Sequence, residues 1–429
     1  MTIGRRRTER NVSQRTSPPF RADHVGSLLR PAELLAARAD FAAGRCDRER
    51  LRAVEDEAIR AVVRMQRDVG LQSATDGEFR RSSWHMDYIY ELGGIEKAED
   101  DISVQFRNAE GTLEFTPAAI HVGGKVHLDH PIFADDLRFL QDSVDAGITP
   151  KLTIPSPSMV HYRGGRAAID TDVYPDVGQF WDDLTAAYAD QVRAVAEMGG
   201  TYLQFDDTSL AYLNDPTQRE QMTRKGEDAA HLHETYIANI NRALAGRPEG
   251  LTVTTHMCRG NFRSSWVAEG GYDFVAQALF GELEVDGFFL EYDDARSGGF
   301  EPLRFVPPGK QVVLGLVTTK RGELEDADQL KRRVEEASKF VPIEQLCLSP
   351  QCGFSSTVEG NALSYEQEVA KLELIVETAR DIWGSEPGSL PAGGPEDLER
   401  DLARRPAVVR DAPSPAASRP RGGTRPRRR

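Results

Sequence analysis

Short apolar runs and longer amphipathic segments alternate along the chain from residue 20 to residue 385. The apolar runs are rich in Val, Ile, Leu and Phe and predict buried strands, whereas the amphipathic segments carry apolar residues at helical spacing. Eight runs predict strands, at residues 20–27, 71–76, 150–155, 202–207, 251–255, 285–291, 311–317 and 345–349. Helices separate most of these strands, which indicates βα units and a parallel sheet.

The amphipathic segments predict helices at residues 47–68, 181–198, 224–245, 326–340 and 364–383. Residues 98–135 interrupt the repeat and predict an inserted excursion of short antiparallel strands, with turns at Gly111 and at Gly123-Gly124. Eight strands over roughly 365 residues predict an α/β fold, a (β/α)8 TIM barrel. A doubly wound open sheet is the alternative, but no glycine-rich phosphate-binding sequence follows the first strand.

The two ends of the chain differ from the rest in composition. Residues 1–19 hold paired arginines in a polar stretch, and residues 386–429 are rich in Pro, Gly, Ala, Ser and Arg. Neither segment can bury a core, so we expect a disordered basic arm at 1–19 and a disordered Pro/Arg-rich tail at 386–429. The catalytic barrel is then expected at 20–385. No apolar segment follows the first arginines, so no secretion signal is expected.

Charge and cysteine content narrow the class of protein. The net charge of −15 argues against general nucleic-acid binding, and no apolar run reaches the length of a membrane span. Four cysteines are too few and too scattered for a disulfide framework, which favours a reducing cytoplasm. Of these, Cys46 and Cys347 are expected to be incidental or buried side chains without a ligand role.

The strand at 251–255 leads into the sequence Thr254-Thr-His-Met-Cys-Arg-Gly-Asn-Phe262. His256 and Cys258 are two residues apart, so in an extended chain both side chains point to the same side. An imidazole and a thiol placed this way form half of a zinc site. A polar strand end with an incidental buried thiol is the alternative, because one His-x-Cys pair lacks the second pair of a zinc finger.

The other half of such a site is expected at other strand ends. Polar residues follow the predicted strands at their carboxyl ends, where barrel enzymes build their active sites. Glu291 closes one of these strands, and Cys352 follows another. In a closed barrel the strand ends converge on one mouth, so His256, Cys258, Glu291 and Cys352 can meet there.

Five sequence blocks resemble the catalytic domain of cobalamin-independent methionine synthase, most closely its shorter, single-barrel bacterial relatives. In chain order they are Val25-Gly-Ser, Asp76-Gly-Glu-Phe-Arg-Arg, Thr255-His-Met-Cys, Phe289-Leu-Glu-Tyr-Asp and Ser349-Pro-Gln-Cys-Gly-Phe. The resemblance spans roughly residues 20–383 and keeps the blocks in the family's order. It implies a (β/α)8 barrel in which zinc (Zn2+) is held by His256, Cys258, Glu291 and Cys352.

The implied ligand set favours alkylation of a thiol over hydrolysis. Two thiolates and one carboxylate turn the +2 charge of zinc into a net −1, which makes a poor Lewis acid for splitting water. Such a site can still deprotonate an incoming thiol, whose free pKa is about 8.5, and leave it nucleophilic. Glu291, the hardest donor, is the ligand we expect to move, and Asp293, Asp294 and Arg296 are expected to orient it. A closed structural zinc site is the alternative.

The resemblance also implies which residues bind homocysteine. Ser27, Glu78 and Asp206 match family positions that grip this amino acid, with the two acids at its ammonium group and Ser27 at its carboxylate. The alternatives are a turn or cap for Ser27 and a surface ion pair of Glu78 with Arg80 or Arg81. Asp206 follows an apolar strand, where a buried acid without a function would be costly.

The chain departs from the family where the methyl donor is expected. Full-length members have a His in a Val-His-Ser-Pro-Arg loop, thought to protonate the folate leaving group. The matching stretch here is Val317-Thr-Thr-Lys-Arg321, without a His. The catalytic proton donor therefore stays unknown, with Lys320, Arg321, His161 and His24 as candidates.

These expectations describe a cytoplasmic, zinc-dependent S-methyltransferase that moves a methyl group to the thiol of homocysteine and forms methionine. Holding the two reactants together would supply much of the rate. The methyl donor stays open between a methylated folate, a sulfonium compound and a carrier protein. Two other functions also stay open: a thiol alkyl transfer like that of the epoxyalkane–coenzyme M transferases, and a non-catalytic zinc- or thiol-binding barrel.

Overall fold

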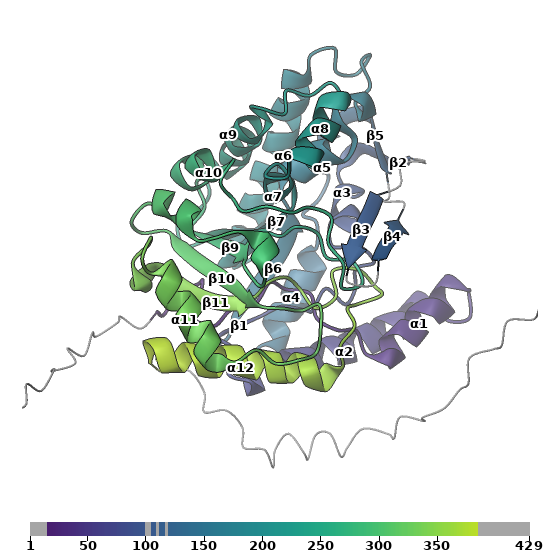
Figure 1. Cartoon of the computed structure of the whole chain (residues 1–429). Coiled ribbons are helices and arrows are strands. Elements are labelled where there is room, and N and C mark those ends of the chain that lie inside the picture. The colour runs from purple at the N-terminus through teal and green to yellow at the C-terminus, as the bar shows by residue number, and fades with distance from the viewer. Residues whose placement is uncertain (1–14, 99–103, 109–110, 116–118, 385–429) are drawn as a thin grey trace, which may run out of the picture. The chain divides into compact units, whose positions relative to one another are not determined.

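The computed structural model describes residues 15–98, 104–108, 111–115 and 119–384. Within these residues seven parallel strands form one curled sheet, in the order β1-β6-β7-β8-β9-β10-β11 (Figure 1). The strands are β1 (Ser73–Ala74), β6 (Thr149–Pro155), β7 (Tyr202–Asp207), β8 (Thr252–Met257), β9 (Gly287–Glu291), β10 (Gln311–Val317) and β11 (Leu346–Pro350). The predicted parallel α/β arrangement is thereby confirmed.

The first of the eight predicted strands, residues 20–27, is not a named strand. It contributes one parallel bridge, between Ala22 and Leu348 of β11. The Asp23 carboxylate accepts the backbone N–H groups of Phe20 at 3.2 Å and His24 at 2.8 Å. Those two amides are therefore unavailable to a neighbouring strand.

Helices flank the sheet and carry the chain from one strand to the next (Figure 1). They are α1 (Ala32–Ala42), α2 (Arg48–Asp68), α3 (Met86–Ile89), α4 (Ala134–Ser143), α5 (Pro157–Gly164), α6 (Val177–Glu197), α7 (Ser209–Tyr212), α8 (Pro216–Arg224), α9 (Leu232–Leu244), α10 (Ala276–Glu282), α11 (Ala327–Ala337) and α12 (Tyr365–Trp383). Short 3-10 turns are η1 (Gly165–Ala168), η2 (Ala295–Ser297), η3 (Glu301–Phe305) and η4 (Ile343–Gln345).

Side-chain caps fix the beginnings of several helices. Asp47 accepts the backbone N–H of Arg50 at the start of α2, and Ser364 forms a reciprocal capping box with Gln367 at the start of α12. The helix predicted at 224–245 was wrong at its beginning. Gly226 has a φ of 87° between α8 and α9, and this left-handed conformation separates the two helices.

The predicted antiparallel excursion is present beside the main sheet. Strand β2 (Gly93–Ala98) pairs with β5 (Ala119–His127), and β3 (Val104–Asn108) pairs with β4 (Gly111–Phe115). The turn predicted at Gly123-Gly124 was wrong, because both glycines lie inside β5. An added Cβ on Gly124 would lie 3.2 Å from Gly94 Cα, and one on Gly94 would lie 2.4 Å from the Lys125 carbonyl oxygen, so close backbone approach explains Gly94 and Gly124.

The two faces of the sheet bury different side chains. Alternate strand residues such as Leu203 and Leu314 join the helices in one large apolar core. Their neighbours in sequence form a second cluster, made of Val25, Tyr202, Phe289, Val313 and Cys347. A sheet that packs side chains on both faces, one against helices and one against itself, matches the expected barrel-like interior.

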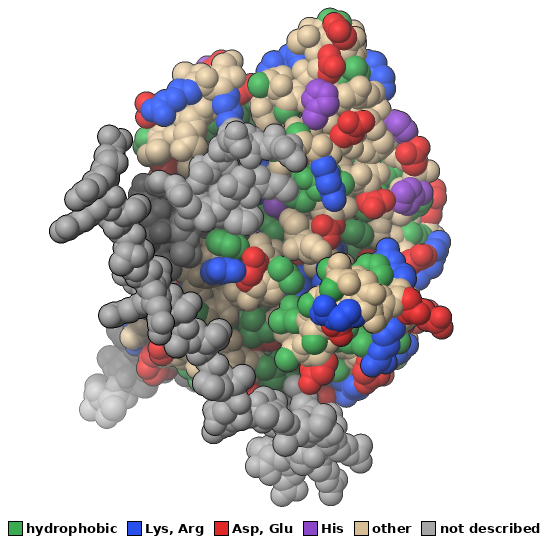
Figure 2. Space-filling model, turned by 90° about the vertical axis from the view of Figure 1, so that its right-hand side faces the viewer, with side chains coloured by type: hydrophobic (Ala, Val, Ile, Leu, Met, Phe, Trp, Pro, Cys, Tyr) green, Lys and Arg blue, Asp and Glu red, His purple; other side chains and the backbone are tan. Residues whose placement is uncertain are grey.

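The predicted arm and tail lie largely outside the described residues, which begin at residue 15 and end at residue 384. Among the residues within those limits, no helix combines the length and the apolar character that crossing a membrane requires. On the face shown in Figure 2, basic and acidic side chains are interspersed.

Candidate metal centre

Three predicted ligands meet at the carboxyl edge of the sheet. His256 lies near the end of β8, Cys258 directly follows that strand, and Cys352 lies two residues beyond β11. Their donor atoms all lie within 4.8 Å of one another, and all three side chains are buried. Neither ring nitrogen of His256 has a hydrogen-bond partner. Two sulfurs and an imidazole are the donor types that zinc prefers, so this cluster fits that ion.

The register of the sheet explains why these side chains meet. Asp206 of β7 pairs with His256 of β8, and Gly315 of β10 pairs with both Glu291 of β9 and Ser349 of β11. Because the strands are parallel, their carboxyl ends all reach the same edge. The Tyr272 hydroxyl also joins β8 to β9, since it accepts the N–H of Glu291 at 2.9 Å and donates to the Met257 carbonyl at 2.9 Å.

The two thiols divide their charge unequally. The neighbouring Cys352 and then burial raise the pKa of the Cys258 thiol well above its usual range. The Cys258 thiol and then His256 lower the pKa of Cys352 well below its usual range. The surroundings of Cys352 therefore favour its thiolate, the form in which a cysteine binds a metal.

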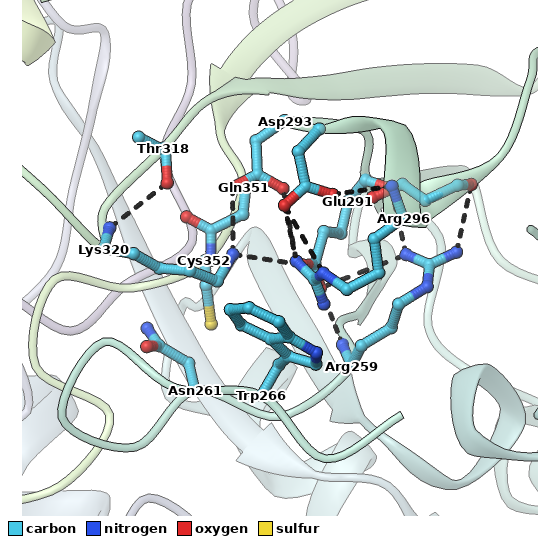
Figure 3. A network of polar contacts seen from close by, with 12 residues as sticks. Arg259, Asn261, Trp266, Glu291, Asp293, Arg296, Thr318, Lys320, Gln351 and Cys352 are labelled. Carbon is cyan, nitrogen blue, oxygen red and sulfur yellow. Dashed lines mark hydrogen bonds and ion pairs between the residues drawn. The ribbon is translucent and has the colours of Figure 1, made fainter. Parts of the chain in front are cut away.

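Glu291, the fourth predicted ligand, is not part of the cluster of donor atoms. Its fully buried carboxylate accepts from Arg296 Nη2 at 2.8 Å, from Lys320 Nζ at 3.1 Å and from the backbone N–H of Arg259 at 2.7 Å. Burial alone would raise the pKa of Glu291, but the cations Lys320, Arg296 and Arg259 outweigh it and hold the pKa well below the usual range. Glu291 is thus an ionised carboxylate close to the cluster (Figure 3).

Ser27 lies beside the residue that follows Cys352, and Glu78 lies beside the residue that precedes Ser27. An added Cβ on Gly353, the residue after Cys352, would lie 1.9 Å from Ser27 Oγ, and one on Gly26 would lie 3.5 Å from Glu78 Oε1. Glu78 is buried and accepts from Thr153 Oγ1 at 2.8 Å, while its Oε2 has no partner. Glu78 also has a left-handed φ of 60°, and strained backbone conformations of this kind at non-glycine residues cluster at functional sites.

The alternative for Glu78 is partly present, because Arg81 Nη1 lies 3.5 Å from Glu78 Oε1. Both side chains are buried, so Glu78 does not form the surface ion pair that the alternative requires. Burial, followed by the nearby Asp76, raises the pKa of Glu78 against the opposing effect of Arg81.

Asp206 lies at the end of β7 and is buried. Burial raises its pKa to about 7, and the neighbouring Glu78 contributes to the increase, while His256 and Lys151 oppose it. Its Oδ1 accepts from Gln204 Nε2 at 2.7 Å. Ser27, Glu78 and Asp206 are therefore brought to the same edge as the candidate metal ligands.

The four candidate proton donors have separate surroundings. Lys320 contacts Glu291 and Asp293, and Arg321 is exposed. His161 of α5 is enclosed by Trp181 and Tyr236, and burial lowers its pKa. His24 is fully buried, which lowers its pKa to about 4.

Three contributors to the site were not recognised from the sequence. Arg259, Tyr272 and Trp266 surround Glu291 or its cations. Arg259 directly follows Cys258 in the sequence, so its position next to a predicted ligand could have identified it as a site residue. Tyr272 and Trp266 lie in a loop without periodicity, so only the fold brings them to the site.

Comparison with known proteins identifies the family of this chain. The family model described as the catalytic domain of cobalamin-independent synthase matches residues 20–381. An uncharacterized protein of Bacillus subtilis strain 168, YxjG, is 47% identical over 378 residues, which cover 87% of this chain and 98% of that protein.

Relatives with named activities are more distant. A 5-methyltetrahydropteroyltriglutamate–homocysteine methyltransferase of Thermotoga petrophila is 22% identical over 370 residues, which cover 85% of this chain and 44% of that protein. A solved structure from Listeria monocytogenes, provisionally named a vitamin-B12-independent methionine synthase, has 37% identity and a TM-score of 0.68, and covers 86% of this chain and 99% of that chain. The chain thus belongs to the cobalamin-independent methionine synthase family and is a methyltransferase of that family.

Proposed function

We propose that this chain is a zinc-dependent S-methyltransferase that moves a methyl group to the thiol of homocysteine and forms methionine. The observation that carries the proposal is the buried cluster of His256, Cys258 and Cys352 at the carboxyl edge of the sheet. These residues would hold zinc, with Glu291 as a fourth donor. The bound ion would supply deprotonation of the substrate thiol, whose free pKa is about 8.5, while leaving the sulfur nucleophilic.

The amino-acid end of homocysteine is assigned to Ser27, Glu78 and Asp206. Burial raises the pKa of both acids, and Oε2 of Glu78 has no partner. An incoming ammonium group would supply a positive charge and hydrogen-bond donors, both of which favour the ionised acids. Ser27 lies next to Gly353 and would donate to the substrate carboxylate.

The methyl donor is proposed to be a methylated folate, as the name of the Thermotoga petrophila relative indicates for that protein. The chain's own contribution is to orient the two reactants and exclude water at the sheet edge, because the burial of the ligands leaves little solvent there. The residue that protonates the leaving group stays unknown. Lys320 is an unsuitable source, since Glu291 and Asp293 both hold its ammonium group.

We also propose that residues 20–27 complete a (β/α)8 barrel within a catalytic domain of residues 20–385. The segment touches both ends of the seven-stranded sheet, through the Ala22–Leu348 bridge and a 3.1 Å bond from Ser73 Oγ to Asp23. A cytoplasmic location is proposed because none of the cysteines at 46, 258, 347 and 352 forms a disulfide.

Methionine formation tests the proposed function directly. Zinc-loaded protein is incubated with homocysteine and methyltetrahydrofolate carrying several glutamates, and the chain is expressed in a methionine auxotroph. We expect product and growth rescue from the wild type, and neither from Cys352→Ala. Zinc binding without any thiol alkylation would favour a binding protein, and alkylation by epoxides alone would favour the alternative transferase.

A further inference from the structure

Glu291 is held by cations from three separate segments. Oε1 of its carboxylate accepts from Arg296 Nη2 at 2.8 Å and Lys320 Nζ at 3.1 Å, whereas Oε2 accepts from the backbone N–H of Arg259 at 2.7 Å. The carboxylate has no solvent exposure. Figure 3 shows Lys320 and Arg296 converging on Glu291 and its neighbour Asp293.

The two cations keep their positions through contacts of their own. Lys320 Nζ donates to Asp293 Oδ2 at 2.9 Å. The Arg296 guanidinium lies 4.5 Å from the centre of the Trp266 ring and 3.3 Å from Asp294 Oδ2. Lys320 and Arg296 can therefore remain in place whether or not Glu291 occupies the space between them.

This arrangement bears on how a buried metal site could accept a substrate. The ligand atoms of His256, Cys258 and Cys352 are close together, whereas the Glu291 carboxylate is bound to cations and is not part of that cluster. A carboxylate that leaves a metal inside a protein needs compensating charge, because an isolated buried anion is costly. Lys320 and Arg296 provide that charge beside the cluster.

We propose that Lys320 and Arg296 form a receiving site that holds the Glu291 carboxylate while the substrate thiol occupies its coordination position. The inference rests on the proposed function, because it assumes zinc at the cluster and a thiol substrate. Lys320 and Arg296 are positioning residues, since they act through Glu291. The opposing view is that both cations only fasten the loop after β9 to the loop after β10.

The experiment compares wild type, Lys320→Met and the charge-preserving Lys320→Arg. Zinc affinity is measured by competition with a chromophoric chelator, and homocysteine binding to the zinc-loaded protein is measured by calorimetry. Without Lys320 the carboxylate has one cation fewer to receive it, so we expect tighter zinc binding, by about tenfold or more, and homocysteine binding weaker by a similar factor. Lys320→Arg is expected to resemble the wild type in both measurements.

A double-mutant cycle separates positioning from a structural effect. In a Glu291→Ala background, Lys320→Met is expected to leave zinc affinity unchanged, because the carboxylate it controls is gone. Equal zinc and homocysteine affinities in wild type and Lys320→Met, with only a lower thermal midpoint, would overturn the inference. Arg296→Gln, read in the same assays, replaces Lys320→Met if that variant does not fold.

Failure of the proposed function has a different signature. If the wild type binds zinc but not homocysteine, the proposed function falls, while the zinc-affinity cycle between Lys320 and Glu291 still decides whether the two residues are coupled. If the wild type binds both and the cycle shows no coupling, only the receiving site is rejected.

Discussion

At the scale of single residues, the spacing of His256 and Cys258 was enough to predict that both side chains point to the same side at the end of their strand. The structure places them within 4.8 Å of Cys352, almost a hundred residues further along the chain. The sequence could not reveal that Glu291 would be held by Lys320, because side-chain direction in loops follows contacts and not periodicity. The assignment of Glu291 as a ligand therefore stays a prediction.

Replacing one sulfur donor tests the cluster. Cys352→Ser is expected to lower zinc affinity by more than about 100-fold. Loss of a metal ligand should cost more affinity than loss of a residue that only hydrogen-bonds to a ligand. Cys347→Ser is the matched control, since Cys347 is buried in β11 but lies outside the cluster. Metal content after dialysis against a weak chelator is the measurement, and equal zinc retention in both variants would contradict the assigned site.

Glu368 of α12 gives a prediction about pH. It is fully buried, its Oε1 accepts from the Leu29 N–H at 3.0 Å, and its Oε2 has no partner. Burial raises its pKa from 4.5 to about 8. A raised folded-state pKa means that the stability contribution is present below about pH 4.5 and is lost as the pH rises towards 8.

Glu368→Gln removes this titration while keeping an acceptor for Leu29. We expect the free energy of unfolding of the variant to exceed that of the wild type by an amount that grows between pH 5 and pH 8, at up to about 1.4 kcal/mol per pH unit. Urea unfolding of both proteins across this range is the measurement. A difference that does not change with pH would refute the assignment.

At the scale of elements, alternating apolar runs and amphipathic segments located the seven strands of the main sheet, because buried parallel strands and surface helices have different periods. They also located the helices α2, α6, α9, α11 and α12, but not the other seven α-helices of the described residues. Two of the errors involve glycines. Gly226 separates α8 from α9, and Gly123-Gly124 lie within β5. A glycine in a sequence does not reveal whether it makes a turn or permits close approach.

Gly315 of β10 shows how tightly the strand ends are packed beside the site. An added Cβ would lie 2.7 Å from both Gln351 Cα and the Leu290 carbonyl oxygen. We expect Gly315→Ala to destabilise the protein by about 1–3 kcal/mol through overpacking, and to weaken zinc binding because Glu291 and Cys352 follow the displaced backbone. Thermal unfolding and the chelator assay measure the two effects.

Gly281→Ala is the matched control for that substitution. Gly281 lies in α10 with nothing within 4 Å of an added Cβ, so alanine should stabilise the helix by up to about 1 kcal/mol. If Gly315→Ala behaved like Gly281→Ala, close packing at the carboxyl edge would not be needed for the site.

At the scale of the whole catalytic unit, the alternation of strands and helices predicted the α/β class and the edge that carries the site. It did not predict that residues 20–27 would supply a single bridge, because strand pairing depends on tertiary contacts such as those of Asp23. Asp23 is buried, accepts from Tyr202 OH at 2.9 Å and forms a 3.4 Å ion pair with the buried Lys151. The N-terminal segment is thereby joined to β6 and β7.

Asp23→Ala tests that connection. It leaves the Lys151 ammonium without its partner, and we expect a loss of about 3–5 kcal/mol in the free energy of unfolding. The double variant Asp23→Ala, Lys151→Met is expected to recover part of this loss, because it removes the unpaired charge. Denaturant unfolding measures both variants, and an unchanged midpoint for Asp23→Ala would show that the segment is not joined to the sheet through this pair.

The most direct test of the central claim is X-ray absorption at the zinc edge of the zinc-loaded wild-type chain, before and after homocysteine is added. The account predicts two sulfur ligands at first, from Cys258 and Cys352, and a third when the substrate thiol binds. A zinc site that keeps the same ligands in the presence of homocysteine would be structural, and the assignment of thiol activation to this site would be wrong.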